Sequence, residues 1–222
     1  MRTLHNYVIQ YQYAYQRNGE IMLTLEDFDK KIRELPEHHE ARPFLCEGSP
    51  IGCKIFIIGL NPSTPISFWP YWSVEYGCKK KEWLNQTLLH YYYRLPPTRK
   101  RIEMLFDILN HYHCLETNIY YMRSQELQLL PKEKRDPQIC YYLIEKIAPK
   151  LIFVHGNDAI KHLEKLAETN LPKGQFKSVT LFGNTTTIYS RNHLSYQCSF
   201  KEVRELGQEF LFWCQKKLEK YF

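Results

Sequence analysis

An uninterrupted apolar run, KIFIIGL at residues 54–60, constrains the fold more than any other feature of the chain. Because no polar residues alternate with the apolar ones, the run predicts a strand that is buried on both faces, as in a parallel sheet. A second run of this kind, KLIFVHG at 150–156, predicts another such strand. Both runs are far too short to span a bilayer.

Helical periodicity separates these strands from one another. It predicts helices over 24–35, 79–93, 98–109, 137–149, 157–168 and 199–218. A strand is expected over 114–122, and a hairpin of two short strands over 178–190, around Gly183-Asn184. Thr24 followed by Asp27, and Ser199 followed by Glu202, are typical of helix N-termini.

Strands and helices alternate from residue 54 onward, which predicts an α/β fold. We expect a three-layer α/β/α sandwich around a central, mostly parallel sheet of four strands. The length of 222 residues fits one domain, with an N-terminal helical extension over 1–41 and an α/β core over 42–222. We further expect a monomer.

The N-terminus, the cysteines and the net charge indicate in which compartment the protein acts and what kind of partner it binds. The N-terminus has no signal-peptide pattern, so we expect a cytoplasmic protein that is nucleoid-associated in a prokaryote or nuclear in a eukaryote, and that has no membrane partner. The seven Cys are widely spaced and lack a C-x-x-C pair, which favours reduced thiols over a metal centre. A net charge of +6 favours a polyanionic partner.

Polar residues gather where the predicted strands end. In an open parallel sheet, ligands bind beyond the carboxyl ends of the strands. Asn61, Asn118 and His193 all lie at such exits and could converge in one cleft. The exits themselves are residues 59–62, 118–120, 155–157 and the turn 190–197.

Three short motifs in the core resemble those of a known family. GLNPS at 59–63 resembles the Gly-x-Asn-Pro motif of the uracil-DNA glycosylase superfamily, above all of its mismatch-specific and single-strand-selective branches. NHLS at 192–195 resembles that family's His-Pro-Ser motif, with Leu194 in place of Pro. ETNIYY at 116–121 resembles its middle strand, which ends in a pyrimidine-reading Asn. The resemblance covers roughly residues 42–220.

The resemblance implies a monofunctional DNA glycosylase that flips a uracil-like or modified base out of DNA and needs no cofactor. Asn61 would orient the attacking water through its carbonyl oxygen, since an amide does not ionise near neutrality. His193 would donate a hydrogen bond to the base oxygen as negative charge develops. No Lys lies in a signature motif to serve as a Schiff-base nucleophile.

The resemblance also implies residues that bind the base and the DNA strand. Asn118 would read the base edge with its paired donor and acceptor, and Gly59, Leu60 and Pro62 would line the pocket. The ring that stacks on the base is expected to be Trp72, with Phe68 and Tyr71 as alternatives. Leu194 or Tyr196 would fill the gap in the base stack. The expected contacts to the DNA backbone are Ser63, Ser195, Arg99 and Arg101.

Plainer interpretations of the same residues stay open. Asn61 could be a turn residue before Pro62, His193 a solvent-facing residue at a helix entry, and Asn118 a strand-end residue that bonds to the backbone. At the level of function, the alternatives are a nucleic-acid-binding protein without turnover and a hydrolase of free nucleosides or modified nucleotides. The matches could also be accidental in an unrelated α/β protein.

Overall fold

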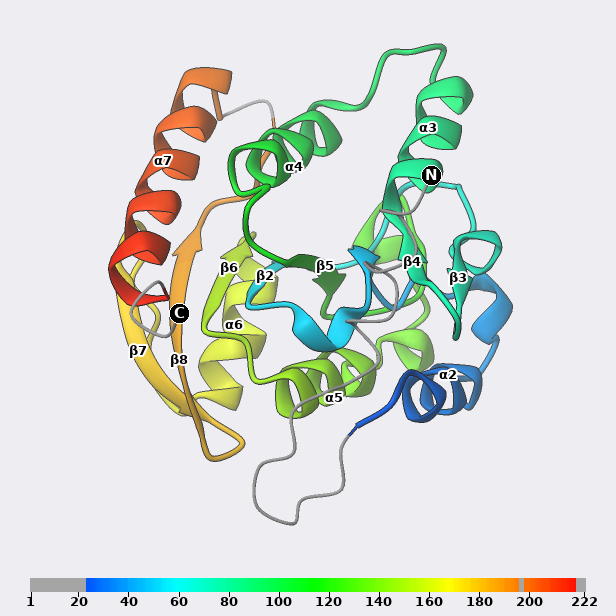
Figure 1. Cartoon of the computed structure of the whole chain (residues 1–222), viewed down its shortest axis with the longest axis horizontal. Helices are drawn as coiled ribbons and strands as arrows, with labels where there is room; N and C mark the ends of the chain where they lie inside the picture. The colour runs from blue at the N-terminus through cyan, green and yellow to red at the C-terminus, as the bar shows by residue number, and fades with distance from the viewer. Residues whose placement is uncertain (1–22, 196–197, 219–222) are drawn as a thin grey trace, which may run out of the picture.

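The protein is built around one mixed sheet of eight strands, with the order β3-β4-β1-β5-β2-β6-β8-β7 (Figure 1). The structure is a computed structural model and describes residues 23–195 and 198–218. The strands are β1 (Leu45–Gly48), β2 (Ile55–Gly59), β3 (Trp72–Ser73), β4 (Gly77–Lys79), β5 (Cys114–Asn118), β6 (Leu151–His155), β7 (Phe176–Leu181) and β8 (Asn184–Arg191). The α-helices are α2 (Leu25–Arg33), α3 (Lys80–His90), α4 (Pro97–Ile108), α5 (Gln138–Ile147), α6 (Asn157–Leu166) and α7 (Phe200–Lys217).

The centre of the sheet is parallel and its margins are antiparallel. Strands β5, β2, β6 and β8 pair in parallel. The chain adds β1, β4 and β3 on one side and β7 on the other, all by antiparallel pairing. The predicted α/β class is therefore confirmed, whereas the prediction of a four-stranded sheet is wrong.

The missed strands β1, β3 and β4 are only two to four residues long. Segments of this length are too short to display an alternating pattern, so their pairing leaves little trace in the sequence. Gly77 lies so close to β1 that a Cβ at this position would stand 2.3 Å from the carbonyl oxygen of Gly48. The close approach of two backbones at a glycine thus fixes the margin of the sheet.

Helices cover both faces of the sheet, because strand side chains point alternately to its two sides. In Figure 1, β2 and β5 run between α4 above and α5 below. On the α4 side, Ile57 of β2 and Phe153 of β6 pack into one apolar cluster with Leu105 and Leu206. The residues next to them in the strands face the opposite cluster, which holds α2, α5 and α6.

Most predicted helix ends agree with the structure. Thr24 and Asp27 form a capping box at α2, and Ser199 and Glu202 form another at α7. The helix expected to start after Thr98 instead begins at Pro97, because proline is well suited to the first helical position. All seven Cys lie within the described residues, are buried and form no disulfide. Across residues 23–195 and 198–218, no helix is long and apolar enough to cross a membrane.

Candidate functional site

The order of the parallel strands places a topological switch point at the carboxyl ends of β2 and β6. The chain leaves β2 toward β5 on one side, whereas it leaves β6 toward β8 on the other. Loops that depart in opposite directions from adjacent strands leave a gap between them, and open α/β sheets bind ligands at such switch points. The residues at these two strand ends are Gly59 and His155.

Gly59 lies between the side chains of Asn118 and His155, and the position left by its missing side chain is called the recess below. Asn118 pairs with Gly59 in the parallel register of β5 and β2. A Cβ at residue 59 would lie 2.9 Å from Asn118 Oδ1 and 3.4 Å from His155 Nε2. Only a residue without a side chain leaves room for both neighbours at this strand end.

Both walls of the recess carry a buried nitrogen without a partner. Asn118 is 5% exposed and His155 is 3% exposed. Asn118 Nδ2 and His155 Nδ1 have no hydrogen-bond partner among the described residues. Native proteins rarely leave buried polar atoms unsatisfied, so each such atom requires an explanation, such as a bound water or ion or a catalytic role. Two such atoms on neighbouring strand ends make this region the candidate site.

His193 lies against this recess. Its ring is 5.1 Å from the ring of His155, centroid to centroid, in an edge-on arrangement. A Cβ at Gly156 would lie 3.5 Å from His193 Cδ2, so the histidine packs over the start of the loop that follows β6. A turn holds it there, since Ser195 N donates to the carbonyl of His193 at 2.8 Å.

His155 is buried, whereas His193 is exposed, as the interpretation of a solvent-facing residue at a helix entry expects. Burial, together with a smaller effect of the nearby His193, lowers the pKa of His155 to about 3, so its ring is neutral at pH 7. Partial desolvation also lowers the pKa of His193. A neutral imidazole has one N–H donor and one acceptor nitrogen, so each ring can donate a hydrogen bond without carrying charge.

Asn61 follows Gly59 by two residues, and its Nδ2 donates hydrogen bonds to two backbone carbonyls, of which that of Pro62 lies at 3.5 Å. Its Nδ2 donates to the carbonyl of Ser124 at 2.7 Å. The loop beneath it stays paired with the chain beyond β5, because Tyr120 N donates to Leu60 and Ser124 N donates to Pro62. The donor side of the amide is thus committed to the backbone, which leaves Oδ1 as the group that can accept from a water or ligand.

A cluster of buried charges lies next to the recess, on the same face of β5 and further from the carboxyl end of that strand. Glu116 precedes Asn118 by two residues, so both side chains point to the same face of β5. Arg99 binds both carboxylate oxygens of Glu116, and Arg42 Nη2 donates to Oε1 at 3.1 Å. Arg99 Nε also lies 3.1 Å from Glu103, which pairs in turn with Lys80.

The cluster has an excess of positive charge. Burial raises the pKa of Glu116, but Arg99 and Arg42 outweigh this effect and lower it to about 2. Burial lowers the pKa of Arg42 to about 10, which still leaves it charged at pH 7. Three cations therefore face two carboxylates beneath the site. Arg42 and Arg99 also lie 5.4 and 5.5 Å from the ring of Trp83, where its π face favours cations.

This cluster contradicts one part of the sequence-based site. Arg99, expected to contact DNA phosphates, is instead buried and engaged by Glu103 and Glu116. Arg101, expected in the same role, is also buried and lies over the ring of Phe200 at 4.9 Å. The basic pattern near the start of a helix could not distinguish a solvated cation from one that compensates a buried carboxylate.

The aromatic residues near position 70 also differ from expectation. Phe68 is 0% exposed and stacks on Trp72 with ring centroids 5.9 Å apart. Trp72 is buried too, and its Nε1 donates to Asp29 Oδ1 of α2 at 2.8 Å. Both rings belong to the core beside Phe44, so the prediction that Trp72 or Phe68 presents a face to a base is wrong for this structure.

Leu194 and Tyr196 are the two residues that were expected to fill the gap in the base stack. Leu194 is fully buried in the α4–α7 cluster, which contradicts a role as a protruding wedge. Tyr196, the other candidate, lies outside the described residues. Of the remaining expected contacts, Ser63 is exposed, Leu60 and Ser195 are half-buried, and Pro62 is buried.

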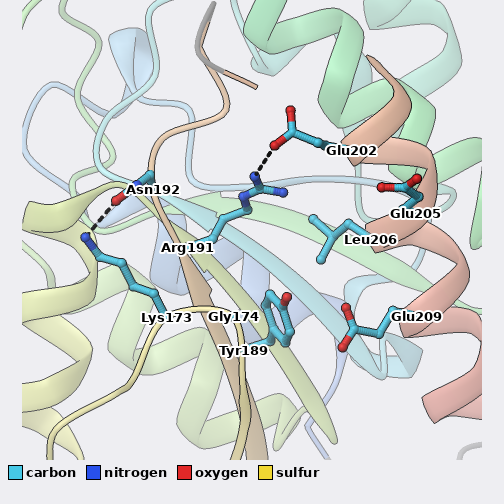
Figure 2. Close-up of a pocket in the computed structure, with 9 residues that line it drawn as sticks. All are labelled: Lys173, Gly174, Tyr189, Arg191, Asn192, Glu202, Glu205, Leu206 and Glu209. Carbon is cyan, nitrogen blue, oxygen red and sulfur yellow. Dashed lines mark hydrogen bonds and ion pairs between the residues drawn. The ribbon is translucent and has the colours of Figure 1, made fainter. Parts of the chain in front are cut away.

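A separate open cavity of about 430 Å³ lies between β8 and α7 (Figure 2). Its lining residues are Lys173, Gly174, Tyr189, Arg191, Asn192, Glu202, Glu205, Leu206 and Glu209. Figure 2 shows Lys173 bonded to Asn192 and Arg191 paired with Glu202. Three carboxylates oppose two cations that already have partners, so the lining does not suit a phosphate backbone.

The main site residue that sequence reasoning missed is His155. It ends an apolar run at a strand exit, and a polar residue at that position was the available signal. Within the described ranges, no group of three or more His, Cys, Asp or Glu side chains is arranged to hold a metal ion. The chain was also compared with known proteins: no family model matches it, and neither does any curated protein.

Proposed function

We propose that the protein is a hydrolase of N-glycosidic bonds that acts on a base extruded from DNA. The observation that carries the proposal is the recess over Gly59, where Asn118 and His155 each hold a buried nitrogen without a partner and His193 closes one side. An extruded base offers hydrogen-bonding edges for such atoms, and enzymes that act on bases read the flipped base in a closely fitting pocket.

Each site residue has a role that its surroundings support. Asn61 orients a water toward C1′ of the sugar through Oδ1, because Ser124 holds its amide nitrogen. As the water attacks, the bond between C1′ and the base breaks, its electron pair leaves with the base, and the proton that the water loses passes through solvent to the base anion. His193 donates a hydrogen bond to the base oxygen as a neutral imidazole, since its pKa is lowered by burial.

Asn118 binds the base edge, and His155 supports His193 from below. The excess of positive charge around Glu116 lowers the energy of the departing anion, because charges interact more strongly in a poorly solvated interior than in water. These interactions act on charge that develops only as the bond breaks. They therefore accelerate the reaction rather than merely tighten binding.

The test is incubation of the purified protein with oligonucleotides that contain uracil, mismatched thymine or a modified base, followed by alkali to cut abasic sites. We expect strand cleavage with at least one substrate. Asn61→Ala and His193→Ala should reduce it by roughly 100-fold or more, since single groups of this kind contribute about 10²–10³ in rate. Clean protein that yields no abasic product on any of these substrates contradicts the proposal.

A second candidate function is hydrolysis of free nucleosides or modified nucleotides. It is favoured by one specific observation: Arg99, Arg101 and Leu194, three residues expected to hold DNA, are buried. This candidate predicts turnover of nucleosides in the absence of DNA, with the same dependence on Asn61 and His193. Release of base from an oligonucleotide but not from the matching nucleoside would exclude it.

A further inference from the structure

The turn after α3 presents two adjacent tyrosines to solvent. Tyr92 is 87% exposed and Tyr93 is 71% exposed, the two highest values among the exposed large hydrophobic residues of the described chain. The connection that holds them, between α3 and α4, runs along the top of the molecule in Figure 1. Two large adjacent rings that are mostly exposed form an available contact surface.

The exposure belongs to a fixed turn. Tyr93 N donates to the carbonyl of Leu88 at 2.7 Å, and Arg94 N donates to the carbonyl of Tyr91 at 2.9 Å. Tyr92 and Tyr93 have φ values of 49° and 62°, in the left-handed region that bulky residues normally avoid. Strain of this kind persists where the surrounding structure fixes the backbone, and it is concentrated at functional positions.

The surroundings of the tyrosine pair are basic. No Asp or Glu occurs between residues 83 and 102, whereas Arg94 and Lys100 flank the turn and are exposed. Arg99 and Arg101 point into the protein and do not contribute to this surface. Along this stretch of the chain, the exposed residues are therefore two aromatic rings followed by two cations, with no carboxylate between them in the sequence.

We propose that Tyr92 and Tyr93 form a stacking platform for single-stranded nucleic acid, with Arg94 and Lys100 binding its phosphates. Unpaired bases expose both faces to aromatic rings, and stacking of this kind is tolerant of sequence. In a duplex the base faces are covered by their neighbours, so the platform selects single strands. Binding here is separate from bond cleavage and does not require the recess over Gly59 to be catalytic.

The experiment measures binding of a labelled single-stranded thymidine oligonucleotide and of a duplex of equal length by fluorescence anisotropy. The double variant Tyr92→Ala/Tyr93→Ala should weaken single-strand binding at least about tenfold, from the contribution of stacked bases. Tyr92→Phe/Tyr93→Phe keeps the rings and should bind as the wild type does. Phe212→Ala removes an aromatic that is 56% exposed on α7 and serves as the matched control.

Three results would overturn the inference: no single-strand binding by the wild type, equal affinity of the double alanine variant, or tighter binding of the duplex. A different partner is indicated if the double alanine variant loses binding to anionic lipid vesicles but keeps its binding to the oligonucleotide. That result would also overturn the inference. Formation of abasic product is measured on the same preparations. Single-strand binding that depends on the two tyrosines, with no abasic product from any substrate, separates a failure of the proposed hydrolysis from a failure of the platform.

Discussion

Gly59 and Asn118 lie side by side at the carboxyl ends of β2 and β5, so close that a Cβ on residue 59 would stand 2.9 Å from Asn118 Oδ1. This contact makes Gly59→Ala a sharp probe of the recess. The added methyl group displaces the Asn118 side chain and also crowds His155. We expect glycosylase activity to fall at least about tenfold, with destabilisation of about 1–3 kcal/mol from overpacking.

Gly52→Ala provides the matched control for that experiment. A Cβ at Gly52 would have no heavy atom within 4 Å, so this substitution should leave both activity and melting temperature near wild type. Abasic-site formation and thermal unfolding are measured on the same preparations. Full activity in Gly59→Ala would contradict the placement of the binding site in this recess.

His155 predicts how stability depends on pH. Its pKa is about 3 in the folded protein and about 6.5 when unfolded, so the unfolded state binds the proton first as pH falls. The stability contributed by neutral His155 is complete above about pH 6.5. It is lost progressively toward pH 3, with a limiting slope of about 1.4 kcal/mol per pH unit.

Urea unfolding at a series of pH values between 5 and 7 tests this prediction. The carboxyl of Glu116 titrates near pH 2 in the folded state and near 4.5 in its ordinary range, so it adds little above pH 5. His155→Gln should flatten the slope between pH 5 and 6.5, whereas His111→Gln, at an exposed position, should not. Identical slopes for wild type and His155→Gln would count against a neutral, buried His155.

The buried pair of Arg99 and Glu116 is expected to behave unlike a surface ion pair. Arg99→Met or Glu116→Gln alone removes one partner of a desolvated pair and should cost about 3–5 kcal/mol. The double variant should lose less than the sum of the two, because it leaves fewer charges without a partner. Unfolding of the four proteins in a double-mutant cycle measures this coupling.

The exposed pair of Lys201 and Glu205, 3.8 Å apart on α7, is the control for that cycle. Its coupling should not exceed about 1 kcal/mol, the usual limit for solvated pairs. If Arg99 and Glu116 couple no more strongly than this, the buried cluster does not have the tight pairing described above.

Phe68→Ala tests whether this ring is core or base platform. The side chain is fully buried against Phe44 and Trp72, so its truncation should destabilise the protein by about 3–5 kcal/mol. Activity per folded molecule should stay near wild type well below the melting temperature. The exposed Tyr76→Ala should change neither property. A variant of Phe68 with normal stability and lost turnover would restore the stacking role.

The sequence was sufficient to predict the buried strands at the parallel centre of the sheet, because the apolar runs at 54–60 and 150–156 are long enough to indicate burial on both faces. It could not predict β3 or β4, which are set by backbone pairing of two or three residues. At the site, strand exits identified Asn61, Asn118 and His193. Burial of Arg99 and of Phe68 depends on partners 17 and 24 residues away in the chain, Glu116 and Phe44, and local patterns do not encode it.

The central place of β2, between β5 and β6, has a consequence for how the protein is made. Asn61 and Asn118 leave the ribosome early, whereas His155 and His193 arrive only with β6 and the segment after β8. Chains fold from the N-terminus as they emerge, but half of this recess cannot exist until the last third of the protein has been synthesised. A nascent or prematurely terminated chain therefore lacks half of the residues that meet at Gly59.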